Sequence, residues 1–499
     1  MKNRIGLILL AVMLALSVSL IGCGPSYTLT MVSTSGGNVS VMREGTADWT
    51  EAQVGISLEP GDIIKSGGNS SAEITFLDGS TIELEAGTEV EVISLDVSAD
   101  TDSITIKLKQ TIGSIIFRVT KIVDPASRYE VETPASIVVI RGSAVRITVA
   151  EDGTTRVCNL EGDIWAIAQG VELQIPEGEC CVVRPGQPPE LEVIFTDPNL
   201  EAVIREAVGK PTGDIYPSDL EGLTSLDARE RNITDLAGLE RCTSLTYLSL
   251  EGNQISDISP LANLTSLTGL GLSGYQIADI SPLVDLTRLT WLSLYDTQIS
   301  DISPLAKLTS LTSLHLDCNQ ISHISPLANL TSLTFLNLDG NQISDISPLA
   351  NLTNLTGLNL GGNQISNISP LANLTSLTDL SLGDNQISDI SPLANLTSLT
   401  RLYLWSNQIS DISPLANFTN LTDLDLNKNG ISNISSLANL TNLIEVTLNQ
   451  NQISDISPLV QNAGLGTGDE VYLEVNPLSS DSINVYIPQL EARGVTVIY

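Results

Sequence analysis

The chain has 499 residues, which is enough for about two or three domains. Asp and Glu total 58 against 23 Lys and Arg, so the formal net charge is −35. Nucleic-acid binding needs clustered cations that displace counterions, and this composition argues against it. The charge suits a soluble acidic surface, or a partner that is cationic or bridged by a metal ion.

Residues 1–22 are expected to be a targeting segment rather than part of the fold. Lys2 and Arg4 precede an apolar stretch over residues 5–21, which ends just before Cys23. This arrangement resembles a bacterial lipoprotein signal peptide, in which Cys23 is lipidated and becomes the first mature residue. The resemblance implies a lipidated tether over residues 23–36. It places the protein in the cell envelope or on the extracellular surface, anchored to a membrane by lipid.

Residues 37–176 are predicted to form an all-β domain. Polar and apolar residues alternate with period two, and Asp-Gly pairs at residues 78 and 152 separate successive runs. Such alternation with Asp-Gly turns is typical of antiparallel hairpins. The clearest expected strands cover residues 71–77, 80–85, 103–108 and 143–149.

The same region carries an ordered set of motifs: PGDII from residue 60, FLDGS from 76, TP from 133, VIRGS from 139, GTTRV from 153 and LEG from 160. In this order they resemble the extracytoplasmic FecR-like domain. Members of that family pass signals across the envelope. The resemblance therefore implies an alternative function, an envelope sensor or regulatory protein acting through this domain.

Several side chains of this domain bear on chemistry. Arg141 could contact an anion, although an Arg that supports a turn is the commoner case, and Trp165 is expected in the core. An oxidising compartment permits one disulfide among Cys158, Cys180 and Cys181. Whether Cys158 pairs with Cys180 or with Cys181 is left open. Because no Cys-x-x-Cys spacing occurs, no zinc site is expected.

The next two segments differ from this strand pattern. Residues 177–190 are rich in Gly and Pro and are expected to be a linker. Residues 191–222 are expected to form a helical N-terminal cap. In this cap Asp197 is the N-cap residue and Pro198 the first helical residue. A cap is needed because a solenoid otherwise exposes core at its end.

Residues 223–476 repeat with a period of 22, as in LTFLNLDGNQISDISPLANLTS from residue 333. This period predicts a leucine-rich repeat solenoid with parallel strands on its concave face and short 3-10 or helical turns on its convex face. Asn341 is expected to satisfy backbone groups at the turn, and Ser347 to cap a one-turn helix that starts at Pro348. Residues 477–499 are expected to form a C-terminal cap. Cys242 falls at a Leu position of the repeat and should be buried. One layer of core is expected from Leu333, Leu336, Leu338, Ile343, Ile346, Leu349 and Leu352.

The repeat resembles the 22-residue type found in bacterial internalins, including the capping segments. Internalins are surface proteins that bind receptors through the concave sheet. The resemblance implies a binding role, with specificity set by the variable positions.

Those variable positions define the candidate ligand-binding residues. Residues between the Leu positions of L-x-x-L-x-L-x-x-N should face the concave side, where exposed aromatic rings among acids suit a basic protein ligand or a glycan. The turn Asn is replaced by Tyr275 and Thr297 in consecutive repeats, so we expect a local perturbation and a binding hot spot there. The candidates are Tyr247, Trp291, Tyr295, Asp296, Phe335, Tyr403 and Trp405.

No catalytic constellation, cofactor motif or metal site is expected. His315, near Asp317, supplies too few ligands for a metal, and the repeated Asp series that includes Asp345 reads as a solvent-facing column. The sequence favours a cell-envelope lipoprotein, not an enzyme, that recognises a protein or glycan ligand with its repeats.

Overall fold

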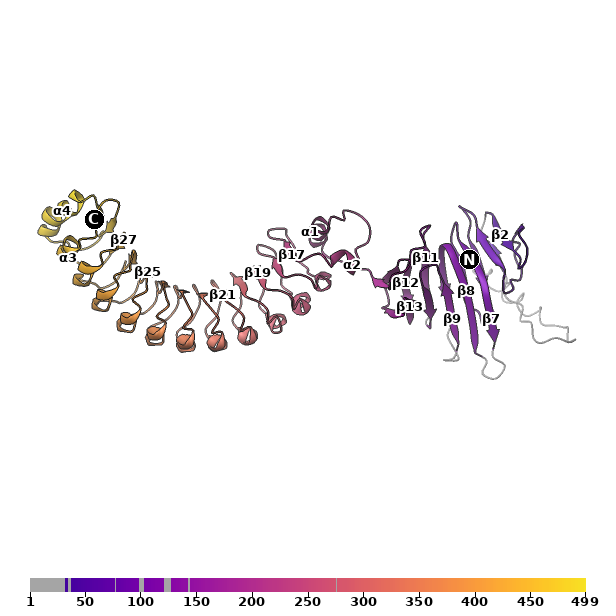
Figure 1. The fold of residues 1–499 in the computed structure, drawn as a ribbon, viewed down its shortest axis with the longest axis horizontal. Coiled ribbons are helices and arrows are strands. Elements are labelled where there is room, and N and C mark those ends of the chain that lie inside the picture. Colours follow the sequence, from indigo (N-terminus) through magenta and orange to yellow (C-terminus); the bar gives the residue numbers. More distant parts are fainter. Residues whose placement is uncertain are drawn as a thin grey trace, which may run out of the picture. The chain divides into compact units, whose positions relative to one another are not determined.

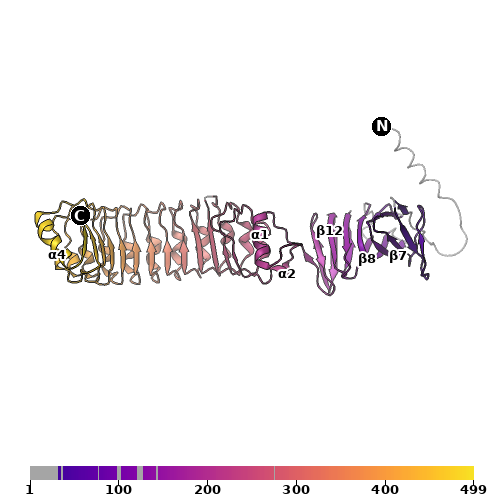
Figure 2. The ribbon, with the colours of Figure 1, turned by 90° about the horizontal axis from the view of Figure 1, so that it is seen from above.

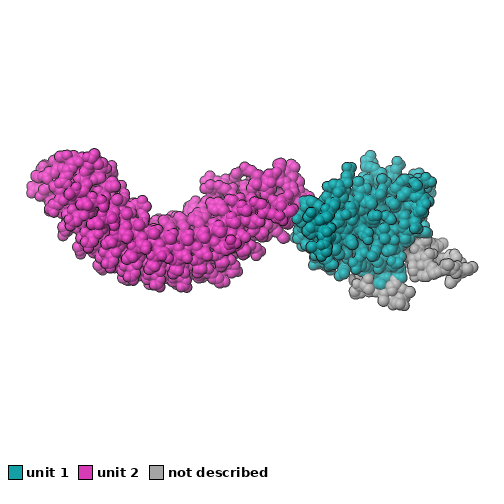
Figure 3. Space-filling model, in the orientation of Figure 1, with its two compact units in different colours: residues 1–192 teal, residues 193–499 magenta. Residues whose placement is uncertain are grey.

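The computed structural model describes residues 32–34, 37–76, 78–97, 103–120, 127–141, 144–274 and 276–499. The expected signal segment, the lipidation site at Cys23 and the substituted turn position Tyr275 lie outside these ranges. The chain divides into two compact units, residues 1–192 and 193–499, which Figure 3 colours separately. Within the described ranges, no helix has the length and apolar character needed to cross a membrane.

The N-terminal unit is all β, as its period-two alternation predicted. Strand β8 organises it: the first part of this strand pairs with β7 and β9, and its last part pairs with β6 and β11. Apolar residues from both groups of strands form one core cluster that includes Ile64, Ile106, Phe117 and Ile147. The strands are β1 (Val32–Thr34), β2 (Val39–Met42), β3 (Trp49–Glu51), β4 (Ile63–Ser66), β5 (Ala72–Thr75), β6 (Thr81–Leu84), β7 (Glu89–Val97), β8 (Ile104–Arg118), β9 (Arg128–Glu132), β10 (Ile137–Ile140), β11 (Ala144–Val149), β12 (Thr155–Glu161), β13 (Ile164–Ala168), β14 (Val171–Ile175), β15 (Cys180–Val183) and β16 (Glu190–Leu191).

The segment expected to be a linker, residues 177–190, belongs instead to this unit. Its strand β15 pairs with β12, and β16 pairs with β15. Cys158 and Cys180 lie directly opposite each other on β12 and β15 and form the disulfide. Cys181 points to the other face of β15, as alternation requires, and is buried in the core cluster. Cys158 therefore pairs with Cys180 and not with Cys181.

The C-terminal unit is a solenoid, which confirms the predicted fold class. Thirteen parallel strands form one sheet in chain order, and Figures 1 and 2 show this unit as a regular stack of coils. In Figure 1 the short turns lie along the outer side of its arc. The strands are β17 (Ser225–Asp227), β18 (Tyr247–Ser249), β19 (Gly269–Ser273), β20 (Trp291–Tyr295), β21 (Ser313–His315), β22 (Phe335–Asn337), β23 (Gly357–Asn359), β24 (Asp379–Ser381), β25 (Arg401–Tyr403), β26 (Asp423–Asp425), β27 (Glu445–Thr447), β28 (Glu470–Tyr472) and β29 (Thr496–Ile498).

The turns are short helices. The 3-10 turns are η1 (Leu239–Arg241), η2 (Ser259–Asn263), η3 (Ser281–Leu283), η4 (Ser303–Lys307), η5 (Ser325–Asn329), η6 (Ser347–Asn351), η7 (Ser369–Asn373), η8 (Ser391–Asn395), η9 (Ser413–Asn417) and η10 (Ser435–Asn439). The other helices of this unit are α1 (Pro198–Val208), α2 (Pro217–Leu220), α3 (Ser457–Gln461), the π-helix η11 (Ser482–Tyr486) and α4 (Ile487–Ala492).

Each repeat is held to its neighbours by buried Leu and Ile and by an Asn ladder. The predicted core layer from Leu333 to Leu352 is fully buried, and so is Cys242. The Asn341 amide donates to the carbonyls of Leu316 and Leu338 and accepts from the N–H of Ile321. It thus satisfies backbone groups of two repeats, as expected.

The predicted N-cap of the convex turn, Ser347, lies one residue too far along the chain. Ser347 is the first residue of η6 rather than its cap. The N-cap position is Ile346, and the carboxylate of Asp345 just before it accepts from the backbone N–H and the hydroxyl of Ser347 at 2.8 and 3.0 Å. The bond from the Ser347 N–H lowers the pKa of Asp345. This column of Asp residues therefore has a structural role at the turns.

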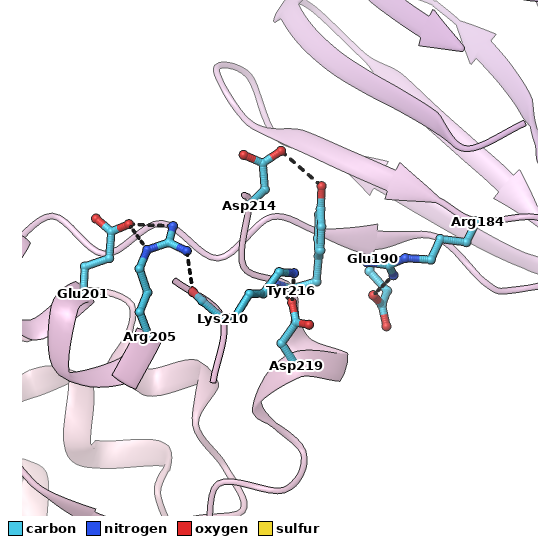
Figure 4. A network of polar contacts seen from close by, with 8 residues as sticks. All are labelled: Arg184, Glu190, Glu201, Arg205, Lys210, Asp214, Tyr216 and Asp219. Carbon is cyan, nitrogen blue, oxygen red and sulfur yellow. Dashed lines mark hydrogen bonds and ion pairs between the residues drawn. The ribbon is translucent and has the colours of Figure 1, made fainter. Parts of the chain in front are cut away.

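The two ends of the solenoid are closed by different elements. At the start, Asp197 caps α1 as predicted, accepting from the N–H groups of Asn199 and Leu200, with Pro198 in the first turn. Figure 4 shows the ion pairs around this cap: Arg205 with Glu201, and Lys210 with Asp219, each at 2.7 Å. The figure also shows Arg184 paired with Glu190 inside the N-terminal unit. At the far end, α4 buries Ile487 and Leu490 in the solenoid core.

Candidate binding surface

The concave face is built from columns of side chains, one residue per strand, because neighbouring strands pair in register. The inner column includes, in chain order, Ser225, Tyr247, Gly269, Trp291, Ser313, Phe335, Gly357, Asp379, Arg401, Asp423 and Glu445. Up to Gly357 its residues are aromatic or small, and from Asp379 to Glu445 they are charged. The buried Leu of each strand lies between these outward positions and faces the core.

Aromatic rings of several repeats join into one row along this face. Tyr247 stacks on Trp291 with ring centroids 6.1 Å apart. Trp291 meets the imidazole of His315 edge-on at 6.4 Å, and His315 lies 5.0 Å from Phe335. Tyr247 and Phe335 remain 40% and 37% exposed. The row is therefore a continuous aromatic surface that is open to solvent.

Small residues beneath the rings explain why they lie against the sheet. A Cβ atom added to Gly269 would come within 2.8 Å of Cδ2 of Tyr247, and one added to Gly357 within 2.8 Å of Cδ2 of Phe335. Each ring thus occupies the space that a side chain on the next strand would fill. The alternation of large and small residues along the inner column holds the rings close to the backbone.

Acidic side chains run beside the aromatic row, including Glu251, Asp317 and Asp339. Burial, together with the charges of Asp317 and Asp384, raises the pKa of Asp339. Burial also raises the pKa of Asp425 farther along the face. Asp339 is thus partly desolvated and repelled by its acidic neighbours, and Asp425 is partly desolvated. A cation placed over them would relieve both effects.

The charged half of the face carries a separate aromatic patch. The indole of Trp405 lies over Gly383 and is 39% exposed. It borders a shallow hollow of about 340 Å³ lined by Asp384, Trp405, Ser406, Asp425, Asn427, Lys428 and Gln450. Tyr403 is the last residue of β25, two residues before Trp405. Its burial and the charge of Asp423 raise the pKa of Tyr403. Arg401, next to it, is paired with Asp379.

The expected perturbation at the missing turn Asn is present. Strands β19 and β20 have five residues each where the typical repeat strand has three, and they pair through to Ser273 and Tyr295. Thr297 cannot bridge the turn as Asn does; its hydroxyl instead donates to the side-chain oxygen of Asn319. Tyr295, 39% exposed, ends the lengthened strand, and Asp296 after it has the left-handed conformation that Cys318 and Asp384 share at the same position of the repeat. Whether this is a hot spot for binding stays a prediction.

The structure thus joins Tyr247, Trp291 and Phe335 in one row and places Tyr403 and Trp405 in another patch. Among the described residues, no ring contact links the two. Sequence reasoning missed His315 as the bridge between Trp291 and Phe335, and it missed the glycines. The available signal was the large–small alternation at the 22-residue period. Burial lowers the pKa of His315, and the described residues contain no cluster of ligands able to hold a metal ion.

Comparisons with known proteins agree with both halves of this description. Residues 62–164 match the FecR protein family. The family described as Leucine Rich repeats (2 copies) matches residues 221–263, 243–285, 287–329, 331–373, 375–417 and 419–461. No curated protein matches the chain.

Among solved structures, the chain is similar to an internalin, InlF, of Listeria monocytogenes. The two share 42% identity with a TM-score of 0.59, over 61% of this chain and 89% of that one. It is also similar to internalin C2 of the same organism, with 45% identity and a TM-score of 0.41 over 42% of this chain and 95% of that one.

Proposed function

The chain belongs to the internalin family of leucine-rich repeat proteins, and from that membership we propose that it is a recognition protein of the cell envelope. In this proposal, lipid on Cys23 anchors it to a membrane, and the concave face of its repeats binds a partner protein. The FecR-like unit lies between the anchor and the repeats in the chain.

The observation that carries the proposal is the aromatic row Tyr247–Trp291–His315–Phe335. Isolated apolar side chains are common on protein surfaces, but a contiguous and exposed aromatic strip is a feature of binding surfaces. Aromatic residues in such strips dominate the energy of protein–protein contacts. Because glycines hold these rings flat, little side-chain entropy is lost on binding.

The charges beside the row favour a basic partner. Glu251, Asp317 and Asp339 flank the rings, and the raised pKa of Asp339 reflects burial and neighbouring negative charge. Lys or Arg side chains of a partner would neutralise this group and could lie over the ring faces. We therefore propose a protein whose contact surface combines apolar and basic residues.

A glycan is the second candidate ligand, favoured by the hollow beside Trp405. This hollow combines an exposed indole with carboxylate, amide, hydroxyl and ammonium groups. Sugars bind proteins by stacking their apolar face on such rings while polar neighbours bond to their hydroxyls. Binding of a glycan at this patch does not require the row that starts at Tyr247.

The test compares soluble residues 27–499 with two variants against panels of extracellular proteins and glycans. One variant replaces Trp291, Tyr295, Tyr403 and Trp405 with Ala. The control replaces Gln342, Gln364, Gln386 and Gln408, which are exposed just after the turn Asn of four repeats, with Ala. A ligand held by the parent and the control but lost by the aromatic variant supports the proposal. A ligand held equally by all three argues against the concave face.

Membrane anchoring has its own test. Cells that express the full chain are grown with a labelled fatty acid. Label on the parent and none on a Cys23→Ser variant is the expected result, because the thiol is the acylated group. Equal label on both proteins would exclude Cys23 as the anchor.

A further inference from the structure

The N-terminal unit carries a hollow of its own, and we propose that it binds a sugar ring bearing a single carboxylate, such as a hexuronic acid residue. The hollow is lined by Arg128, Val139, Arg141, Trp165, Ile167 and Glu172. This proposal goes beyond the proposed function of the concave face and does not depend on it.

Strand register places these residues together on the outer face of the sheet. Val139 pairs with Trp165 across β10 and β13, and Ile167 pairs with Glu172 across β13 and β14. Their chain neighbours Val138, Ile164 and Ala166 belong to the core cluster. Because successive residues of a strand alternate between faces, Trp165 points away from the core. The expectation that Trp165 is a core residue is therefore wrong.

The floor of the hollow is apolar although it faces outward. Val139 is only 3% exposed, while Trp165 and Ile167 are half-buried. The guanidinium carbon of Arg141 lies over the Trp165 ring, 5.1 Å from its centroid. Arg141 also lies at the end of β10, where a turn-supporting role was expected. Its contact with the indole shows that the side chain lines the hollow instead.

The charges of the hollow leave one guanidinium without a carboxylate. Glu130, 5% exposed on the neighbouring strand β9, is paired with Lys107 at 3.1 Å and with Arg128. Arg141, in contrast, forms no ion pair with any carboxylate in the described ranges. In a chain with a net charge of −35, an exposed Arg held against a ring and free of a carboxylate is poised for an external anion. Arg is suited to this role because its fork binds a carboxylate through two parallel bonds.

The other walls restrict the anion. The hollow, of about 190 Å³, has room for one ring-sized group. Trp165 and Ile167 offer an apolar surface for the C–H face of a ring. Glu172 can accept a hydroxyl hydrogen bond but repels a second negative charge. A hydroxylated ring with one carboxylate meets all three conditions, whereas a phosphate or a dicarboxylate does not.

The experiment titrates D-glucuronate into the full chain and follows binding by saturation-transfer NMR, with D-glucose and acetate as separate ligands. D-glucuronate is expected to bind more tightly than either, because glucose lacks the carboxylate and acetate lacks the ring. Arg141→Gln should weaken glucuronate binding at least about tenfold, since it removes a charge-assisted bidentate contact. Glu172→Gln keeps a hydroxyl acceptor but removes the negative charge that faces the bound carboxylate, so it should tighten glucuronate binding.

Two control variants separate this site from other surfaces. Arg118→Gln removes an exposed strand Arg that is paired with Glu83 on β6, and it should bind like the parent. Trp405→Ala tests the hollow of the concave face: loss of glucuronate binding in this variant, while Arg141→Gln binds like the parent, would overturn the assignment to the N-terminal unit. Equal binding of glucose and glucuronate, unchanged binding by Arg141→Gln, or no binding at all would overturn the proposal. Tighter binding of a peptide with a free C-terminal carboxylate would overturn the assignment to a sugar.

Discussion

Tyr247 reaches across Gly269 to stack on Trp291, two strands away, with the ring centroids 6.1 Å apart. The contact exists because the intervening strand carries no side chain at this position. The two rings are therefore already in place before a ligand binds. An arrangement formed in advance lowers the entropy that binding must otherwise remove.

Filling the space beneath the rings should therefore weaken binding without unfolding the protein. In Gly269→Val, the new Cβ would lie 2.8 Å from Cδ2 of Tyr247, so the ring must tilt away from the sheet. We expect a loss of about tenfold in affinity for the concave-face ligand, measured by calorimetry. Ser313→Val, in the same column but already bearing a Cβ, is the control. Equal affinities for Gly269→Val and the parent would show that ring position is unimportant.

The turn Asn should matter more for stability than the Thr that replaces it. Asn341→Ala removes the three bonds that the amide donates to backbone carbonyls and the one that it accepts at a buried site, and we expect a cost of about 2–3 kcal/mol. Thr297→Ala, at the equivalent position two repeats earlier, should cost less than about 1 kcal/mol because Ile299 keeps its bond to Asn319. Urea unfolding measures both. Equal costs would contradict the bridging role of Asn.

Asp197 should stabilise the first repeat as well as the cap helix. One carboxylate oxygen caps α1, and the other accepts from the backbone N–H and hydroxyl of Thr234 at 2.7 and 3.0 Å. Burial alone would raise the pKa of Asp197, but these hydrogen bonds lower it. Asp197→Ala should cost about 2–3 kcal/mol of unfolding free energy, measured by urea unfolding at neutral pH. A cost as small as that of an exposed helix cap, about 1 kcal/mol or less, would refute the link to the first repeat.

His315 should make stability fall as the solution becomes acidic. Burial lowers the pKa of His315, against opposing contributions from Asp317 and Glu251, so the unfolded chain binds its proton more readily. The contribution is complete above the unfolded value of about 6.5 and is lost as the pH falls below it. The melting temperature of the parent should drop more between about pH 7.5 and about pH 5.5 than that of His315→Phe, which keeps a ring in the row. Parallel curves would exclude this effect.

The fold of the C-terminal unit could be predicted from the sequence because every repeat carries the same pattern of apolar residues. Each Leu and Ile of the unit from Leu333 recurs at the same place, so one interpretation of the pattern fixes every layer of core. The predicted cap at Asp197 was confirmed for a similar reason: an Asp-Pro pair before a helical period has one common structural meaning.

Other features depended on register, which the sequence does not reveal. Cys180 and Cys181 are adjacent, and only the pairing of β12 with β15 decides which of them faces Cys158. The segment Ile-Trp-Ala-Ile-Ala from residue 164 is apolar on both faces, so period two could not show that Trp165 points outward. Because Gly and Pro residues flank β15, the composition of residues 177–190 predicted a linker and did not reveal this short strand.

The candidate surface was predictable in part. The repeat identified which positions face outward, and so it identified Tyr247, Trp291 and Phe335. Whether rings on different strands meet depends on side-chain directions across the sheet, and these became visible only in the structure. His315 was considered as a metal ligand, yet its contacts are with two aromatic rings.

The most direct test of the central proposal is the affinity of a protein ligand for the parent and for the variant in which Trp291, Tyr295, Tyr403 and Trp405 are all Ala. Calorimetry on residues 27–499 would measure it, with circular dichroism to confirm that the variant is folded. We expect affinity to fall at least about 100-fold. A folded variant that binds the ligand as tightly as the parent would contradict recognition through the concave face.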